Sequence, residues 1–436
     1  MTSKLFNQLA ITIFFIFLIA PTVGRIFGIN SRTDNTEYRR LLTAPVIKDT
    51  PLYRIPKNIT DYFNDDFGLR NIFIKFYGSI KLNIFNTHPT WGAILGKKGW
   101  IFMNPVVFPT VDKWHLHADF TEDELSQIAR YLENEYDWLK ERGIPYIVVI
   151  VPYKEHIYPE YYPYPDNIVS KPQLVHFLKF TQTHTKLQIL DLRDPLIRAK
   201  SIYPVYYHTD SHWNQWGAYV GYQEIGKVLT RQNPYFHTFQ PDEFNITPQY
   251  YQHWVGDLVR TSAIWKDQVP DVNVKLQLKP EYANKYPKLR TAFVYGDSFA
   301  KTQHFASKED FLNNFPQLKD RLDLIFTSPF DGPELKIKLP IDDLIPELEK
   351  AIPDKNLVKR VERYLVNFRL QDDELLGINY FLNLNFKMIH FEQTQHPLEK
   401  ELIEKERPQV VVREVIEQVL YSSFDELLKS NHQGKK

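Results

Sequence analysis

The chain has 436 residues, of which 43% are hydrophobic and 15% aromatic, enough for one large domain or two smaller ones. Lys plus Arg and Asp plus Glu each number 53, so the formal net charge is zero and bulk charge gives no reason to expect a nucleic-acid partner. The absence of cysteine excludes disulfides, thiol catalysis and thiolate metal sites.

The N-terminus contains an apolar stretch from Leu5 to Val23, preceded by Lys4 and followed by Arg25. Its length is just sufficient to span a bilayer, which predicts a signal-anchor within residues 1–25. A cleaved signal peptide, with Thr22–Gly24 as the small-residue cleavage site, is the alternative interpretation. Both interpretations place the rest of the chain outside the cytoplasm, held in the cell membrane in the first case and secreted in the second.

Residues 26–58 are polar and contain prolines, which favours a juxtamembrane linker before a main domain at 59–436. Helical apolar spacing follows from Ile59 to Phe85. Within it, Asp66 and Arg70 are one helical turn apart, and we interpret them as a structural ion pair or cap. Gly96–Phe102 then predicts a turn followed by a short strand.

The next element is a helix with clear start and stop signals. Thr121 and Glu124 form a capping box, apolar residues then repeat at helical spacing, and Gly143 ends the helix. The run Tyr146–Val151 that follows is entirely apolar and rich in β-branched residues. This pattern is typical of a strand buried on both faces, and hence of a parallel sheet covered by helices.

Similar runs predict further central strands at 187–192 and 290–295, and strands near the C-terminus at 386–391 and 409–412. Helices alternate with these strands, so the predicted fold class is α/β, a doubly wound three-layer sandwich with a mostly parallel sheet. Residues 307–385 interrupt the alternation. They are densely charged and show helical spacing, for example at Leu344, Leu348 and Ile352, so we interpret them as a helical insertion.

Gly296-Asp297-Ser298 directly follows the predicted strand at 290–295, which places Ser298 at a strand's carboxyl end, where open α/β sheets bind ligands. The glycine permits a sharp turn, and the backbone N–H of Ser298 is a candidate oxyanion donor. The alternative is that Ser298 merely caps the following segment. The motif alone is a weak signal; its position after a strand strengthens it.

Asp210 and His212 precede a predicted helix from about Gln215 to Leu229, with Asn214 as its cap. In an extended chain the two side chains share one face, so they are able to reach a serine at a neighbouring strand end. Together with Ser298 they supply the groups of a Ser/His/Asp acyl-transfer site. The sequence leaves open whether Asp210 bonds His212 directly, and whether both are only surface residues around a helix cap.

His208, Asp210 and His212 also invite a metal interpretation, because alternate residues line one face of a strand and imidazole and carboxylate ligands suit zinc. That interpretation leaves the Gly-Asp-Ser motif unexplained, so we expect no metal and no cofactor. Tyr153 and Lys154, at the end of the Tyr146–Val151 strand, are candidate substrate contacts or else part of a solvated loop. Trp213 is a candidate sugar contact, although packing behind His212 is the stronger interpretation.

The order Asp-x-His and then Gly-Asp-Ser resembles the SGNH hydrolase-like domain of alginate O-acetyltransferases of the AlgJ and AlgX type. Ordinary SGNH enzymes carry the serine near the start and an Asp-x-x-His pair near the end. Further motifs in the family's order extend the resemblance over most of residues 60–300 and a C-terminal strand: Asp66–Arg70, Gly96–Phe102, Pro152–Tyr158, Thr209–Asn214, Gly256–Leu258, Gly296–Phe299 and Arg407–Val412. The insertion at 307–385 is not part of this pattern.

The resemblance implies that Ser298 is the nucleophile, His212 the base and Asp210 the acid that orients it. It also implies a periplasmic or extracellular site, a polysaccharide acceptor, and a membrane-bound O-acyltransferase that supplies the acetyl group. We therefore predict a membrane-anchored polysaccharide O-acetyltransferase that acts through an acetyl-serine intermediate. A carbohydrate acetylesterase and a catalytically silent subunit of a polysaccharide export complex are the alternatives.

Overall fold

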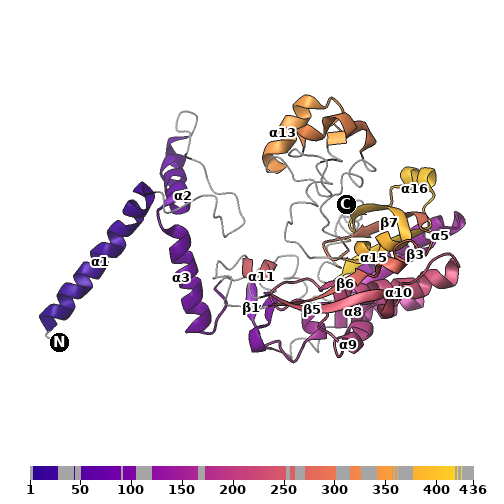
Figure 1. The fold of residues 1–436 in the computed structure, drawn as a ribbon, viewed down its shortest axis with the longest axis horizontal. Helices are drawn as coiled ribbons and strands as arrows, with labels where there is room; N and C mark the ends of the chain where they lie inside the picture. Colours follow the sequence, from indigo (N-terminus) through magenta and orange to yellow (C-terminus); the bar gives the residue numbers. More distant parts are fainter. Residues whose placement is uncertain are drawn as a thin grey trace.

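The computed structural model describes residues 3–27, 44, 51–89, 92–104, 120–164, 172–251, 256–260, 271–300, 315–325, 341–355, 357–358, 361, 377–417, 420 and 424. Three N-terminal helices lie to one side of an α/β body (Figure 1). They are α1 (Ser3–Ile26), α2 (Ile55–Asp66), which follows the 3₁₀ turn η1 (Leu52–Arg54), and α3 (Arg70–Asn83). Helix α1 is long and apolar enough to cross a membrane, as its composition predicted.

The predicted helical segment at 59–85 is two helices with a sharp turn between them. Leu69 adopts a left-handed conformation with φ 63°, which stops α2 and α3 from forming one helix. The turn packs against α1 so closely that a Cβ atom on Gly68 would lie 2.0 Å from the Pro21 carbonyl oxygen, so only glycine fits. Helix α2 also begins within the last residues of the predicted linker.

Asp66 and Arg70 have the predicted structural role but not the predicted partner. Asp66 forms an ion pair with Arg25 at the end of α1, with 2.7 Å between Oδ2 of the aspartate and Nη2 of the arginine. Arg70 instead donates from Nε to the Asn64 carbonyl at 2.7 Å. The turn at Leu69 carries Arg70 away from Asp66, because the i,i+4 geometry that would pair them requires a continuous helix.

The body is built on a parallel five-stranded sheet in the order β4-β3-β9-β7-β8. Its strands are β3 (Tyr146–Val151), β4 (Ile189–Asp191), β7 (Leu289–Gly296), β8 (Phe386–Gln393) and β9 (Val410–Ile416). Alternate residues of β3 enter two separate cores: Ile147 and Val149 join one, Val148 and Ile150 the other. Helices therefore cover both faces, which confirms the predicted three-layer α/β class.

One face is covered by α9 (Arg193–Ala199), α10 (Gln215–Gln232) and α15 (Ile378–Asn385), and the other by α5 (Glu122–Glu141), α8 (Pro172–His184) and α16 (Lys400–Glu406). Smaller elements surround them: α6 (Lys154–Ile157), α11 (Asp257–Arg260), the hairpin β1 (Ala93–Leu95) and β2 (Ile101–Met103) with its turn η2 (Lys97–Gly99), and the antiparallel pair β5 (Phe244–Tyr251) and β6 (Asp271–Leu278). The short turns η3 (Pro241–Glu243) and η5 (Pro280–Tyr282) flank that pair.

Local signals in the sequence correctly located α5. The Thr121 hydroxyl accepts a hydrogen bond from the Glu124 N–H at 3.2 Å, the Glu124 carboxylate accepts one from the Thr121 N–H, and Gly143 has a φ of 67°. The strand at 187–192 was predicted less well. Only Ile189–Asp191 forms β4, and β4 is a half-buried edge strand instead of a central one.

The predicted insertion at 307–385 contains η6 (Pro316–Leu324) and α13 (Ile341–Ala351) among its described residues. Leu344, Leu348 and Ile352 are buried, as their spacing predicted. Helix α15, at the end of the predicted range, belongs instead to the main core, because Ile378, Phe381 and Leu382 are buried against the sheet. The apolar residues of α15 have the same helical spacing as those of α13, so the sequence did not distinguish a helix of the main core from a helix of the insertion.

Candidate active site

Ser298 lies immediately after the carboxyl end of β7, as predicted from the motif. The turn requires glycine at 296: a Cβ atom there would lie 2.5 Å from the Ala300 Cβ and 2.9 Å from a Glu414 carboxylate oxygen. Asp297 shapes the next step of the turn, since its Oδ1 accepts the Phe299 N–H at 2.8 Å. The strand and the turn together place the serine hydroxyl at the carboxyl end of the parallel strands.

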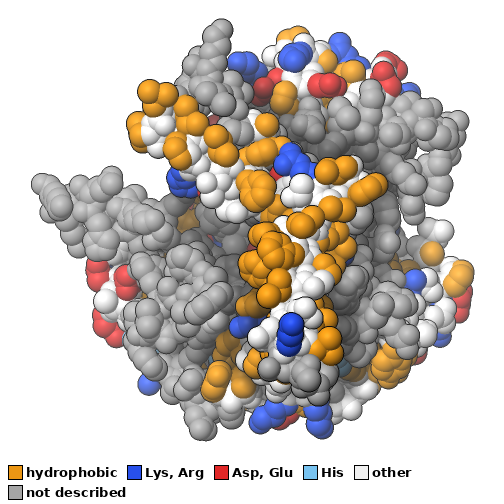
Figure 2. All heavy atoms as spheres, turned by 90° about the vertical axis from the view of Figure 1, so that its left-hand side faces the viewer, with side chains coloured by type: hydrophobic (Ala, Val, Ile, Leu, Met, Phe, Trp, Pro, Cys, Tyr) orange, Lys and Arg blue, Asp and Glu red, His pale blue; other side chains and the backbone are white. Residues whose placement is uncertain are grey.

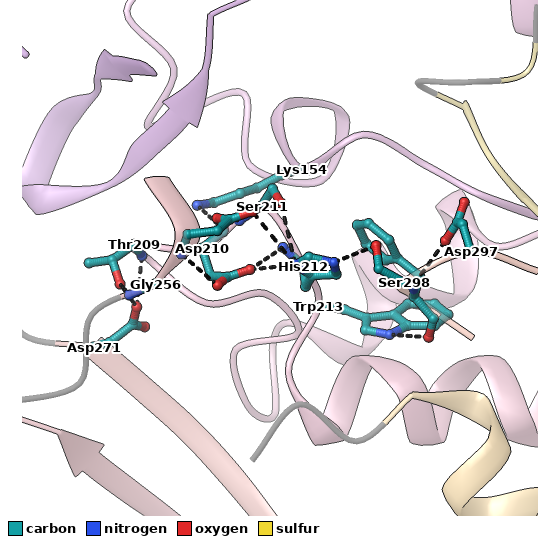
Figure 3. A network of polar contacts seen from close by, with 12 residues as sticks. Lys154, Thr209, Asp210, Ser211, His212, Trp213, Gly256, Asp271, Asp297 and Ser298 are labelled. Carbon is teal, nitrogen blue, oxygen red and sulfur yellow. Dashed lines mark hydrogen bonds and ion pairs between the residues drawn. The ribbon is translucent and has the colours of Figure 1, made fainter. Parts of the chain in front are cut away.

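His212 joins Ser298 to Asp210 in a continuous hydrogen-bonded chain (Figure 3). The Ser298 hydroxyl lies 2.6 Å from His212 Nε2, and His212 Nδ1 lies 2.6 Å from Asp210 Oδ1. In the tautomer that fits both contacts, Nδ1–H donates to the carboxylate and Nε2 accepts from the serine. The structure thus answers what the sequence left open: Asp210 bonds His212 directly.

The loop that carries Asp210 and His212 is bent, which corrects the expectation of an extended chain. Asp210 Oδ1 also accepts the backbone N–H of His212 at 2.9 Å, so the carboxylate folds back over the residue it orients. A bridge between Tyr206 and Trp213 closes the base of the loop. Asn214 then caps α10 as predicted, accepting the Gly217 N–H at 3.1 Å.

Asp271, the first residue of β6, holds the start of this loop. It accepts the backbone N–H groups of His208 and Thr209, each at 2.7 Å, and the Thr209 hydroxyl also donates to it. Gly256 then donates its N–H to the Thr209 hydroxyl at 3.1 Å. Because the buried Asp271 carboxylate accepts these hydrogen bonds, it fixes the backbone at the start of the loop, which has no regular secondary structure to hold it.

Lys154 supports the same loop from the opposite side, a structural role that the sequence did not indicate, and it also lines the depression beside the triad. It is buried, and its Nζ donates to the carbonyls of Ile101, His208 and Asp210 at 2.6, 2.8 and 3.0 Å. Burial, opposed mainly by the charges of Asp271 and Asp210, lowers the pKa of Lys154 to about 8. The amine joins the β1–β2 hairpin to the loop that carries His208 and Asp210.

Asp257 is a second carboxylate beside the histidine, and its role was missed in the sequence. It accepts the backbone N–H of Ser211 at 2.8 Å and the Ser211 hydroxyl at 2.5 Å. Its backbone N–H donates to Asp210 Oδ2 at 2.8 Å, and its Oδ2 is 3.8 Å from His212 Nδ1. The Gly256–Leu258 motif was the only sequence signal, and it did not reveal the contact with the histidine.

The alternative metal set is not assembled. The ring of His208 lies 4.3 Å from that of Trp100, away from Asp210 and His212. Among the described residues, Asp210, His212 and Asp257 bring possible ligand atoms within 4.8 Å of one another. Both ring nitrogens of His212, however, already contact Asp210 and Ser298, which suits proton transfer better than metal binding.

These carboxylates determine the charge of the site. Burial lowers the pKa of His212, but the charge and hydrogen bond of Asp210, with further help from Asp257, outweigh it and raise the pKa to about 9. Burial likewise opposes ionisation of Asp210, whose pKa is nonetheless lowered by His212 to about 2. The pKa of Asp257 is raised to about 6 by burial and by the neighbouring Asp210 charge. The site therefore favours a histidine cation beside an ionised Asp210.

A pair of buried carboxyl groups lies directly behind the serine. Glu414 on β9 accepts the Asp297 N–H at 3.1 Å, and the two side chains interact with each other. Burial raises the pKa of both groups, that of Glu414 well above its usual range. Two buried carboxyl groups in contact are stable only when they hold a proton between them. We therefore assign Glu414 as the protonated member.

Tyr153 and Trp213 differ in their access to a ligand. Tyr153 is largely buried but lines an open depression beside the triad, together with Met103, Lys154, Ser211, Phe299 and Ile416. Trp213 is buried, and its Nε1–H donates to the Phe299 carbonyl at 3.1 Å. Trp213 therefore packs behind the histidine, and its alternative role as a sugar contact is wrong; Tyr153 keeps its place beside the candidate substrate space.

The fold is that of the SGNH hydrolase-like class. Residues 93–306 match the family model described as "SGNH hydrolase-like domain, acetyltransferase AlgX". This match over residues 93–306 confirms the resemblance to the SGNH hydrolase-like domain that the motifs indicated.

The curated relatives are named as probable alginate O-acetylases AlgJ. The protein from Pseudomonas syringae pv. tomato is 26% identical over 202 residues, which cover 45% of this chain and 48% of that protein. AlgJ of Pseudomonas aeruginosa is 22% identical over 183 residues, 42% of this chain and 44% of that protein. The chain thus spans about half the length of the curated relatives it matches.

Solved structures give weaker similarity. The O-acetyltransferase domain of Pseudomonas putida AlgJ has a TM-score of 0.40 at 18% identity, covering 79% of this chain and 99% of that domain. Bacillus cereus PatB1 also has a TM-score of 0.40, at 12% identity, covering 75% of this chain and 96% of that one.

Proposed function

We propose that this chain is an O-acetyltransferase that transfers acetyl groups to hydroxyls of an extracellular polysaccharide. The observation that carries the proposal is the Ser298–His212–Asp210 hydrogen-bonded chain at the carboxyl edge of the sheet, with 2.6 Å at each step. The names of the AlgJ relatives support polysaccharide O-acetylation as the activity class. The residues alone support acyl transfer.

In the proposed first step, Ser298 Oγ attacks the carbonyl carbon of an acetyl donor while His212 Nε2 takes the hydroxyl proton. The tetrahedral intermediate collapses, the bond to the donor's leaving group breaks, and that group takes the proton from His212. Acetyl-Ser298 remains. Asp210 keeps the imidazole in the required tautomer and stabilises its cation, which agrees with the raised pKa of His212.

In the second step a sugar hydroxyl replaces the donor. His212 takes the proton of that hydroxyl, the sugar oxygen attacks the acetyl carbon, and Ser298 leaves and recovers a proton from His212. The backbone N–H of Ser298 donates to no other group among the described residues, so it is available to the oxyanion in both steps. Tyr153, which lines the depression beside the triad, is the proposed acceptor contact.

The proposed location of the protein rests on α1. We propose that α1 anchors the chain in the cell membrane with the catalytic domain on the extracytoplasmic side. A membrane-bound O-acyltransferase then supplies the acetyl donor, and a polysaccharide is the acceptor. The charge-neutral composition gives no sign of adaptation to a strongly anionic polymer, so the acceptor is proposed only as a polysaccharide.

A chromogenic acetyl ester tests the triad. Ser298→Ala and His212→Ala should each lower acetyl release by about four to six orders of magnitude, the range expected when members of a triad are removed. Ser201→Ala is the matched control, because its exposed hydroxyl only bonds the Arg198 carbonyl and its loss should leave the rate unchanged. Wild-type rates in the triad variants would refute the mechanism.

Product analysis separates the transferase from the acetylesterase alternative, in which water takes the place of the sugar. With an oligosaccharide acceptor present, a transferase forms acetylated oligosaccharide at the expense of free acetate. An esterase forms only acetate at an unchanged rate. Absence of Ser298 labelling by a serine-directed acylating probe would favour the catalytically silent subunit.

A further inference from the structure

Helix α3 has an apolar face that is exposed in the part of the chain that the structure describes. Of its 14 residues only Arg70 and Gly78 are buried, although the helix is rich in large apolar side chains. Phe76 is 58% exposed and Ile84, just after the helix, 71% exposed. The exposed apolar positions define the α3 strip: Ile72, Phe76, Tyr77, Ile84 and Phe85. An exposed strip of this kind on a soluble surface indicates an interaction site.

The charges on α3 are of one sign. Lys75 and Lys81 lie within the helix, and no acidic residue occurs between Arg70 and Asn83. The Lys81 ammonium lies 5.6 Å from the centre of the Tyr77 ring, so cation and aromatic residue are presented together. Apolar and aromatic side chains combined with lysines are typical of helices that lie in the interface of an anionic bilayer.

Helix α3 is also joined to the candidate membrane span. The Phe73 and Phe17 rings are stacked with 6.1 Å between their centres, and Gly24 lies against Leu69. Phe17 is eight positions before Arg25, or about 12 Å along the helix axis. If Arg25 marks the outer end of the span, Phe73 is therefore at the depth of the acyl chains. Figure 1 shows α1 and α3 meeting near the end of α1 and running apart from there.

We propose that α3 lies in the outer leaflet of the membrane, with the α3 strip in contact with lipid and the side chains of Lys75 and Lys81 extended toward anionic headgroups. This inference rests on the proposed anchoring by α1. Figure 2 shows the side of the molecule that carries α1, where hydrophobic side chains form a band across the face. With α1 and α3 both in lipid, the catalytic domain is held at a fixed height above the membrane instead of swinging on one helix.

The test uses the full chain, which contains no cysteine, so single cysteines report on chosen positions. An environment-sensitive fluorophore is attached after Phe76→Cys on the α3 strip, Ile13→Cys on α1, or Tyr235→Cys, an exposed aromatic residue beyond the end of α10. Each protein is reconstituted at high dilution into vesicles of phosphatidylcholine and phosphatidylglycerol. Quenching is measured with doxyl-labelled lipids and with aqueous iodide.

We expect lipid quenching at 13 and several-fold stronger lipid quenching at 76 than at 235, where iodide should dominate. Adding Lys75→Glu and Lys81→Glu should weaken lipid quenching at 76 more in these vesicles than in phosphatidylcholine alone. Lipid quenching at 13 with iodide quenching at 76 would overturn the inference and leave the anchor intact. Iodide quenching at 13 would overturn the anchor itself, and the inference with it. Shielding of 76 from both quenchers would assign the α3 strip to a second copy of the chain instead.

Discussion

His212 is the residue whose chemistry the structure defines most closely. Its neutral form is the base in the proposed mechanism, while Asp210 raises its pKa to about 9 and so favours the cation at neutral pH. A base of this kind is strong but mostly protonated, so activity should depend steeply on pH. The cationic form also stabilises the fold below the unfolded histidine pKa, and this contribution is lost as pH rises through about 9.

We therefore expect kcat/KM for an acetyl ester to rise with pH up to an apparent pKa near 9. Asp210→Asn removes the charge that raises this value, so the midpoint should move toward an ordinary imidazole pKa and the plateau should fall by about four orders of magnitude. Rates are corrected with Ser298→Ala for spontaneous ester hydrolysis. A wild-type midpoint near 6.5, unchanged in Asp210→Asn, would contradict the predicted electrostatics.

Replacement of Glu414 tests the pair that this residue forms with Asp297 behind Ser298. If it is the protonated member of the pair with Asp297, Glu414→Gln preserves its charge, its shape and an acceptor for the Asp297 N–H. This variant should keep activity within about tenfold and leave the pH profile unchanged. Glu414→Leu leaves that N–H and the Asp297 carboxyl without a partner, so we expect at least about 1–3 kcal/mol lower unfolding free energy and a clear loss of kcat. Equal damage in both variants would show that Glu414 is ionised.

The sequence predicted the residues of the triad because the motif types and their positions beside a strand and a helix are local features. It did not predict Asp257, Asp271 or Glu414 as neighbours of the site, because each arrives from a distant segment. Lys154 illustrates the ambiguity of a single lysine at a strand end. The same side chain suits an anionic substrate or buried carbonyls, and only the packing of the β1–β2 hairpin decides between them.

At the scale of elements, the prediction worked where local signals are strong and failed where tertiary contacts decide. The capping box and Gly143 bounded α5 correctly. The helical pattern at 59–85 gave no sign of the left-handed Leu69, whose conformation depends on the approach of α1 to Gly68. The edge position of β4 likewise depends on which strands pair, and not on its own residues.

Lys154 connects strand β2 to the loop that carries His208 and Asp210, so its replacement tests how much this connection stabilises the protein. Lys154→Met leaves three buried carbonyls, on β2 and this loop, without their common donor. We expect the unfolding free energy to fall by about 2–4 kcal/mol and kcat to fall with the loss of Asp210 positioning. The matched control is Lys140→Met on the exposed side of α5, which should change the unfolding free energy by about 0.5 kcal/mol or less. Equal effects of the two substitutions in denaturant titrations would remove Lys154 from this role.

At the scale of the whole molecule, β9, the last strand among the described residues, occupies the middle of the sheet. β9 lies between β3 and β7, so it joins the half of the sheet that follows α5 to the half that carries Ser298. It also supplies Arg413, which is buried and bonds Glu135 of α5 at 2.7 Å, and Glu414, which lies behind Ser298. The sequence predicted the strand at 409–412 but not its central place, because strand order is a property of the complete fold.

The central place of β9 predicts unequal tolerance to the same substitution in two strands. Val412 on β9 is fully buried between β3 and β7, whereas Lys387 is exposed on the edge strand β8. Val412→Asp puts an unpaired carboxylate where no water reaches it, at a cost of several kcal/mol, comparable with the stability of a whole domain. We expect this variant to lose cooperative thermal unfolding and acetyl-ester activity together. Lys387→Asp should keep both, with a Tm within a few degrees of the wild type. Equal melting temperatures in the two variants would mean that the chain does not depend on β9 to hold the two halves of the sheet together.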